Sequence, residues 1–238
     1  MTHHNTIAQI TVYQQHKQKH TSTRTYTPTK IGKRYGDFAT VSVFFIKFVN
    51  NFFPMESNHD ARCAVLGYGS WATAVVKTLT ENGHHVSWLV LNEDIATELR
   101  SRGRNPKYLP WCDLPRNLIT PSADINEVVR NADVVILAMP SAFLPKFLAP
   151  LTESLSDKIV VSMVKGIIPG DYLTIVEYMH RHYAVDMSKL CVVTGPSHAE
   201  EVGMGRLSYL TVVSRSEQAQ KIMGAMIERD YIRVNYSQ

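Results

Sequence analysis

The segment that most constrains this chain is Ala61–Ala74, which reads ARCAVLGYGSWATA. A short apolar run, Cys63–Leu66, stops at Gly67 and Gly69, and a helical pattern follows at once. A strand that stops at glycines and resumes as a helix leaves backbone N–H groups unpaired at the helix start, where the helix dipole also favours negative charge. The segment therefore predicts a turn that binds a phosphate.

The spacing of the small residues matches the dinucleotide fingerprint G-x-G-x-x-G/A. Gly67 permits the tight turn, Gly69 lets a pyrophosphate approach the backbone, and Ala72 is small enough for helix and strand to pack closely. Ser70 and Trp71 occupy the start of the helix that follows. The fingerprint alone is equally compatible with an ordinary strand–helix turn, so the rest of the chain has to decide between the two interpretations.

Beyond residue 61, short apolar runs alternate with amphipathic segments, a pattern typical of βαβ units with a parallel sheet. The pattern predicts strands at 63–66, 86–91, 132–139, 158–164, 190–194, 206–213 and 231–234. It predicts helices at 70–82, 93–100, 125–129, 143–155, 172–182 and 217–228, and a proline-rich loop at 104–121. We therefore expect an α/β fold with a doubly wound, Rossmann-like parallel sheet over residues 59–238.

Ligands of such sheets gather beyond the carboxyl ends of the strands. Here that edge is predicted to carry residues 67–71, 139–141, 165–166 and 195–197, and this convergence favours the dinucleotide interpretation. The fold also calls for an acid about twenty residues after the glycines, to hold the adenosine ribose. Asn92-Glu93-Asp94 lies there, but its acids fit the first turn of a helix equally well. The sequence therefore leaves NAD and NADP open.

Three further residues are candidates for chemistry at the same edge. Lys165 directly follows a strand and precedes a glycine, so its charge could hold a phosphate or polarise a carbonyl. Ser197 is expected to cap a helix in a capping box with Glu200, and the exposed N–H groups there suit an anionic or carbonyl ligand. His198 is either an acid–base group or a structural histidine. The histidines show no metal-ligand spacing, so we expect no metal site.

The first part of the chain differs from the rest. Residues 1–34 contain ten basic or histidine residues and no acid, whereas the whole chain of 238 residues carries a formal charge of only +4. Residues 1–58 are expected to form a disordered or non-native extension, with a transit peptide or a nucleic-acid arm as the alternatives. Met55 is a candidate for the natural start. Without the extension the charge gives little support for a nucleic-acid partner.

The cysteines and the apolar segments indicate the compartment. Cys63, Cys112 and Cys191 form no paired motif, which suits a reducing cytoplasm, and Cys63 and Cys191 are expected to be buried strand thiols. The apolar stretch at 38–53 is interrupted by polar residues and is too short to span a membrane. We therefore expect a cytoplasmic protein without a membrane span.

Four motifs taken together carry a resemblance to a known family. GYGSWATA, NPKYLP, VKG and GPSHAEEV, the last followed by RLSYLT, occur in unbroken order between residues 61 and 235. They resemble the NAD(P)-dependent glycerol-3-phosphate dehydrogenases, and GPSHAEEV is far more specific than any glycine motif. Other dehydrogenases, such as the 6-phosphogluconate or ketopantoate types, share the glycine turn but should lack GPSHAEEV.

The resemblance implies reduction of dihydroxyacetone phosphate to sn-glycerol 3-phosphate by NADH or NADPH, for phospholipid synthesis. It implies that Gly67, Gly69, Ser70, Trp71, Lys165 and Ala199 bind the cofactor and that Lys165, Gly195 and Ser197 bind the substrate. In the full-length family it also implies a possible homodimer.

Two departures from the family pattern bear on activity. The third fingerprint residue is usually glycine and here is Ala72. Members of the family also continue into a helical domain that carries the catalytic lysine, and the present sequence ends at Gln238 before such a domain. No catalytic residue is therefore assigned. We expect the cofactor-binding portion of the enzyme, inactive by itself, with a non-catalytic nucleotide-binding regulatory module as the alternative.

Overall fold

The structure is a computed structural model that describes residues 61–238. The extension expected over residues 1–58, with the candidate start at Met55, lies outside the described residues. The strands are β1 (Cys63–Leu66), β2 (Val86–Leu89), β3 (Ile119–Ser122), β4 (Val134–Leu137), β5 (Ile159–Ser162), β6 (Leu190–Thr194), β7 (Ser208–Ser214) and β8 (Ile232–Ser237). The α-helices are α3 (Ser70–Glu81), α4 (Glu93–Arg102), α5 (Ile125–Arg130), α6 (Leu144–Leu148), α7 (Ile175–Tyr183), α8 (Ala199–Gly203) and α9 (Glu217–Ile227). Short 3-10 turns lie at η2 (Arg116–Leu118), η3 (Ser141–Phe143) and η4 (Met187–Lys189).

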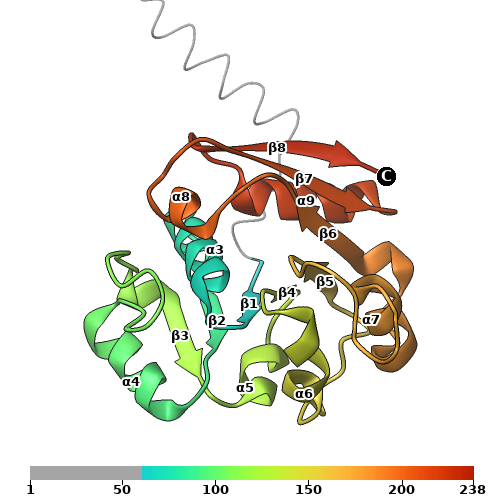
Figure 1. Cartoon of the computed structure of the whole chain (residues 1–238), viewed down its shortest axis with the longest axis horizontal. Helices are drawn as coiled ribbons and strands as arrows, with labels where there is room; N and C mark the ends of the chain where they lie inside the picture. The colour runs from blue at the N-terminus through green and yellow to red at the C-terminus, as the bar shows by residue number, and fades with distance from the viewer. Residues whose placement is uncertain (1–60) are drawn as a thin grey trace, which may run out of the picture. The chain divides into compact units, whose positions relative to one another are not determined.

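The eight strands form one sheet in the order β3-β2-β1-β4-β5-β6-β7-β8, as Figure 1 shows. Strands β1 to β6 are parallel, and β1 lies between β2 and β4, with Cys63 paired with Val86 on one side and with Val134 on the other. The chain therefore leaves β1 toward one edge of the sheet and returns to β4 on its other side. This reversal of strand order at β1 is the feature of a doubly wound sheet that creates a ligand crevice.

Both faces of the sheet are covered, because side chains alternate along each strand. In β1, Cys63 and Val65 pack into a core with α3, α4, α8 and α9, whereas Ala64 and Leu66 pack into a second core with α5, α6 and α7. All four β1 side chains are at most 1% exposed, as expected for a strand buried on both faces. The doubly wound, Rossmann-like fold predicted from the sequence is thus confirmed.

The end of the sheet departs from the prediction. Strand β7 runs antiparallel to β6, with Thr194 paired with Thr211, and β8 is parallel to β7. A parallel return would need a crossover long enough to pass back along the sheet. The connection contains only the five-residue helix α8, so the chain reverses direction. The predicted parallel sheet is therefore found in β1 to β6, and the last two strands run in the opposite direction.

Two local predictions were also wrong. The segment 104–121 was predicted to be a loop, but its end pairs with β2 as the edge strand β3. This strand contains Pro121, which an edge strand tolerates and which hides the strand from the apolar pattern. The helix predicted at 143–155 is only α6, preceded by the turn η3. Pro150 follows the C-cap Ala149 and explains the early end, because proline has no backbone N–H to donate the next hydrogen bond of the helix.

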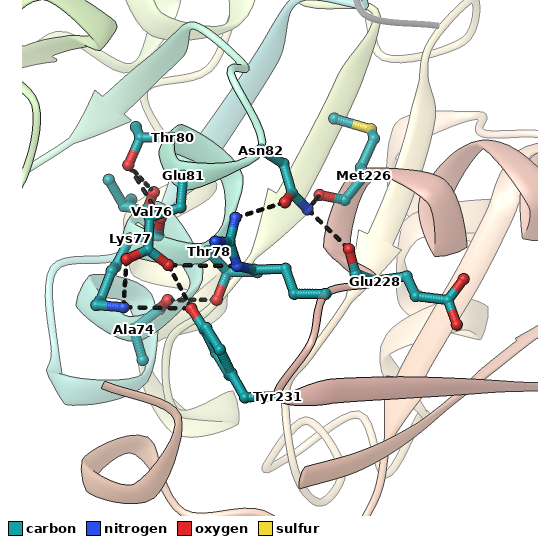
Figure 2. A network of polar contacts seen from close by, with 11 residues as sticks. Ala74, Val76, Lys77, Thr78, Thr80, Glu81, Asn82, Met226, Glu228 and Tyr231 are labelled. Atoms are coloured by element: carbon teal, nitrogen blue, oxygen red, sulfur yellow. Dashed lines mark hydrogen bonds and ion pairs between the residues drawn. The ribbon is translucent and has the colours of Figure 1, made fainter. Parts of the chain in front are cut away.

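The last turn of α3 is tied to the segment between α9 and β8 by a set of polar contacts (Figure 2). Glu81 accepts hydrogen bonds from Lys77 at 2.6 Å and from the Tyr231 hydroxyl at 2.5 Å. Lys77 Nζ also lies 3.2 Å from that hydroxyl. Asn82, the C-cap of α3, donates to the Met226 carbonyl at 2.8 Å. These contacts fix α3 against the antiparallel end of the sheet.

Candidate functional site

Two adjoining cavities open at the carboxyl ends of the parallel strands. Their volumes are about 890 Å³ and 790 Å³, and they share Gly69 and the segment 138–140 that follows β4. The shared wall therefore lies at the β1–β4 reversal of strand order, where a doubly wound sheet binds its ligands. The first cavity contains Gly67 and Gly69, and the second contains Gly69 with the other candidate residues, Ser70, Trp71, Lys165, Gly195, Ser197 and Ala199.

Gly67 is the residue that makes the turn possible. Its φ is +125°, and a Cβ at this position would lie 2.4 Å from the Ala138 carbonyl oxygen, so a side chain is excluded both by conformation and by space. The buried Trp88 indole donates a 2.6 Å hydrogen bond to the Gly67 carbonyl from β2. The turn is therefore held rigidly between β2 and the end of β4.

The start of α3 is left open. Its N-cap is Gly69, with no side-chain cap, and its first turn contains no acidic residue. A Cβ added at Gly69 would meet no atom within 4 Å, and its φ of −71° is ordinary. The unpaired N–H groups of a helix start usually receive a cap or a ligand. Gly69 lines both cavities, and Ser70 and Trp71 line the second, so this helix start suits an anion.

Asn105 fixes the loop opposite this turn, and nothing in the sequence pattern of NPKYLP singles it out. Its buried side chain donates to the Tyr68 carbonyl and to Thr73 Oγ1, both at 2.8 Å. Its Oδ1 accepts from the backbone N–H groups of Lys107 and Tyr108, both at 3.1 Å. The side-chain oxygen and nitrogen are thus both used, and the loop carrying Tyr108 is held against the glycine turn.

The second cavity brings together polar side chains that follow β5 and β6. Lys165 is exposed just after β5, Gly195 follows β6, and Ser197 is 9% exposed. Gly195 has φ +155°, and a Cβ there would lie 2.3 Å from the Tyr209 carbonyl oxygen, so β7 passes directly behind this turn. His198 lines the same cavity and is exposed. The Lys165 ammonium, the Ser197 hydroxyl and the His198 imidazole thus belong to residues that line a cavity large enough for part of a nucleotide and a small substrate.

The capping box predicted for Ser197 and Glu200 is absent. Helix α8 begins at Ala199 with His198 as its N-cap, and no side-chain cap is formed. The reason is local, because the Ser197 N–H turns back to the Gly195 carbonyl at 3.0 Å, which delays the helix by one residue. The Ser197 hydroxyl is thereby left on the cavity wall instead of being used by the helix.

The acids considered for the adenosine ribose serve α4. Asn92 is the N-cap and accepts from the Ile95 N–H at 3.1 Å. Glu93 forms an ion pair with Arg100, and Glu93 and Asp94 both lie in the first turn. Neither acid lines the first cavity, whose wall at the end of β2 is Leu89, Val90 and Leu91. The helix-acid alternative therefore describes these residues better than the ribose-binding one.

The three thiols are unsuited to chemistry at neutral pH. All three cysteines are free and buried, as predicted for Cys63 and Cys191. Burial raises the pKa of Cys63 to about 12 and that of Cys112 to about 11, and it also raises the pKa of Cys191. The thiolate is the nucleophile and metal ligand, so these groups remain protonated and inert. Within residues 61–238, no group of three or more His, Cys, Asp or Glu side chains is placed to hold a metal ion.

Comparison with known proteins identifies the family. The sequence model of the NAD-dependent glycerol-3-phosphate dehydrogenase N-terminus matches residues 62–220. The chain belongs to this family. Similar curated proteins include the glycerol-3-phosphate dehydrogenase [NAD(P)+] of Halalkalibacterium halodurans, 32% identical over 173 residues, and that of Geobacillus kaustophilus, 34% identical over 174 residues. Each alignment covers 72% of this chain and 50% of the relative.

Solved structures agree on the fold. A glycerol-3-phosphate dehydrogenase of Plasmodium falciparum superposes with a TM-score of 0.69 at 22% identity, covering 74% of this chain and 52% of the other. The corresponding yeast enzyme gives a TM-score of 0.66 at 24% identity, covering 74% and 56%. The family model and the curated relatives confirm the resemblance found in the motifs, and with it the cofactor class of the family, NAD or NADP.

The chain spans about half the length of the curated relatives that it matches. What is established for this chain is accordingly the N-terminal, dinucleotide-binding type of domain of an oxidoreductase family. Within the part of the chain that the structure describes, no helix combines the length and the apolar character needed to cross a membrane.

Proposed function

We propose that this chain binds NAD(H) or NADP(H) across the two cavities, as the cofactor-binding part of a glycerol-3-phosphate dehydrogenase. The observation that carries the proposal is the open start of α3 at the β1–β4 crevice, with Gly67 and Gly69 making room for a pyrophosphate. The first cavity would take the adenosine end, and the second would take the nicotinamide and the substrate. Ser70, Trp71 and Ala199 would contact the cofactor there.

The substrate proposed from the relatives' names is dihydroxyacetone phosphate in one direction and sn-glycerol 3-phosphate in the other. Lys165, Gly195 and Ser197 line one cavity and would bind it, with the lysine as the fixed positive charge near the phosphate or carbonyl oxygen. The bound cofactor supplies the hydride. The protein's part is to hold the two reactants in register at this edge of the sheet.

We further propose that the 238 residues by themselves turn over little or no substrate. Reduction of a carbonyl requires an acid to protonate the forming alkoxide, which contributes roughly a factor of 100 to 10,000 in rate. In the second cavity the candidates are Lys165 and His198, both exposed. The family relatives contain as much sequence again, from which such an acid could come.

Substitution of Gly69 by valine tests cofactor binding without disturbing the fold. Isothermal titration with NADH, NADPH and ADP-ribose should show binding to the native chain and at least about a tenfold loss in the variant, because the new side chain enters the space of the pyrophosphate. The variant should remain folded, since no atom lies within 4 Å of the added Cβ. Absence of binding to the native chain, or unchanged affinity in a folded variant, would contradict the proposal.

An activity assay separates the two parts of the proposal. Oxidation of NADH or NADPH in the presence of dihydroxyacetone phosphate should be at background for the purified chain. Turnover that disappears in Lys165→Ala or His198→Ala would show that the acid is already present in this part of the protein. Cofactor binding without any response to either triose phosphate would favour a non-catalytic nucleotide-binding module.

A further inference from the structure

The wall of the first cavity at the end of β2 is apolar and carries no cation. In doubly wound dinucleotide sites, the adenosine ribose binds at the end of the second strand. An acid there binds the 2′-hydroxyl of NAD, or an arginine nearby binds the 2′-phosphate of NADP. In this chain the segment 89–94 reads LVLNED, and it contains two acids and no cation. Its exposed member at the cavity is Leu91, which is 50% exposed.

The polar groups beside Leu91 are already engaged. Asn92 Oδ1 caps α4 by accepting a hydrogen bond from the Ile95 N–H. Glu93 is paired with Arg100, whose other nitrogen donates to the Pro121 carbonyl at 2.8 Å. Arg100 is thereby held against β3 and does not line the cavity.

The segment after the neighbouring strand β3 supplies a carboxylate to this cavity. Asp124 follows β3 and lines the first cavity, and one of its carboxylate oxygens accepts from the Asn126 N–H at 2.8 Å as the N-cap of α5. A 2′-phosphate beside this carboxylate would meet a like charge, which disfavours binding where water is partly excluded. The hydroxyl of NAD carries no such penalty.

The lysines near the first cavity do not lie at its β2 wall. Lys146 lines it from α6, which follows β4, beside Phe147 and Pro150. Lys107 lies 5.9 Å from the Tyr108 ring, on the loop held by Asn105. The ribose, in contrast, is read at the end of β2. These lysines therefore do not replace the arginine that a 2′-phosphate requires.

We propose that this wall selects NAD(H) over NADP(H), with Leu91 as the residue that sets the choice. The inference rests on the proposed binding of a dinucleotide across the two cavities. Leu91 packs against the ribose edge and offers no partner to a 2′-phosphate, while Asp124 repels it. The preference belongs to the adenosine end and is independent of the substrate.

Isothermal titration of the native chain with NADH and NADPH tests the inference, with the Leu91→Arg variant and Leu91→Gln as the uncharged control of similar length. NADH should bind at least about tenfold more tightly than NADPH to the native chain. Leu91→Arg should strengthen NADPH binding by roughly tenfold, because an arginine pairs well with a phosphate, and should leave NADH nearly unchanged. Leu91→Gln should not change the ratio.

Three outcomes would overturn the inference. Equal or tighter binding of NADPH by the native chain contradicts it directly, and loss of that binding in Lys146→Gln would assign the phosphate to the α6 side. An unchanged ratio in folded Leu91→Arg would show that Leu91 does not border the ribose. If neither nucleotide binds the native chain, the proposed function fails as well, so the two failures are distinguishable.

Discussion

The two ends of α3 are built in opposite ways. At its start, Gly69 supplies no side-chain cap and the first turn has no acid, so the helix N–H groups remain open to the cavities. At its end, Lys77, Glu81 and Asn82 are bonded to the segment 226–231 (Figure 2). The start of the helix leaves backbone N–H groups for a ligand. The end of the helix uses its polar side chains in hydrogen bonds within the protein. The helix can thus be firmly anchored while its functional end stays unfilled.

The largest expected effect is at the open end. Gly67→Ala should destabilise the fold by about 3 kcal/mol or more, because the residue must keep φ +125° and its Cβ would lie 2.4 Å from a carbonyl oxygen. Chemical denaturation measures this loss. Gly69→Ala is the matched control and should unfold at the native denaturant concentration. Equal stability of the two variants would show that the turn relaxes at no cost.

The second largest effect is expected from the loop that Asn105 holds against the start of α3. Asn105→Ala removes four hydrogen bonds of a fully buried side chain, so we expect a loss of about 2 to 3 kcal/mol together with weaker cofactor binding. Asn235→Ala, at an exposed position of β8, should change neither quantity. A variant that loses stability but keeps full affinity would separate the loop from the site.

A substitution at the bonded end of α3 should change stability and leave cofactor binding unchanged. Tyr231→Phe removes the hydroxyl that bonds to Glu81 and Lys77 and should cost about 1 to 2 kcal/mol. Tyr209→Phe, on the exposed side of β7, is the control. Titration calorimetry with NADH should give the native affinity for both folded variants. A lowered affinity in Tyr231→Phe alone would mean that the two ends of α3 are coupled.

The same cluster predicts a dependence on pH. Although burial acts to raise it, hydrogen bonds from Lys77 and Tyr231 hold the pKa of Glu81 below its ordinary value of 4.5. The stabilisation is therefore fully present above that pH and is lost as the pH falls through the lower folded-state pKa. The difference in unfolding free energy between the native chain and Glu81→Gln should shrink below about pH 4.5. A difference that stays constant down to pH 3 would contradict this assignment.

The smallest effect is expected at α8. Ser197→Ala should change the unfolding free energy by less than about 0.5 kcal/mol, because the hydroxyl does not cap the helix. Thr174→Ala is the contrasting case, since Thr174 and Glu177 form a full capping box at α7, and its loss should cost about 1 kcal/mol. Thermal unfolding of both variants compares the loss of a capping box that the structure contains with the loss of a serine whose predicted capping box does not form.

The sequence predicted the parts of the fold that depend on local pattern. The alternation of apolar runs and amphipathic segments gave the doubly wound sheet, and the glycine spacing gave the turn at the β1–β4 crevice. The reversal at β7 was missed because strand direction depends on how far α8 can carry the chain, which no periodicity reports. The edge strand β3 was missed because it is short and contains Pro121.

The site shows the same division. The motifs selected residues that lie together in two cavities, since each motif sits at a strand end. The role of Asn105 escaped notice because its four partners come from both the turn and its own loop. The capping box at Ser197 was wrong because the Gly195–Ser197 turn competes for the same backbone N–H. Such competition is decided by three-dimensional geometry.

The hydrogen bond from Trp88 to the Gly67 carbonyl gives the turn an optical reporter. The Trp88 indole is fully buried and lies directly beneath the residue that shapes the turn, whereas Trp71 is half-buried at the cavity and Trp111 is 46% exposed. Their emission should differ accordingly in wavelength and in access to a dissolved quencher. Filling of the cavity would shield Trp71, strain at the turn would shift Trp88, and Trp111 would serve as the internal reference.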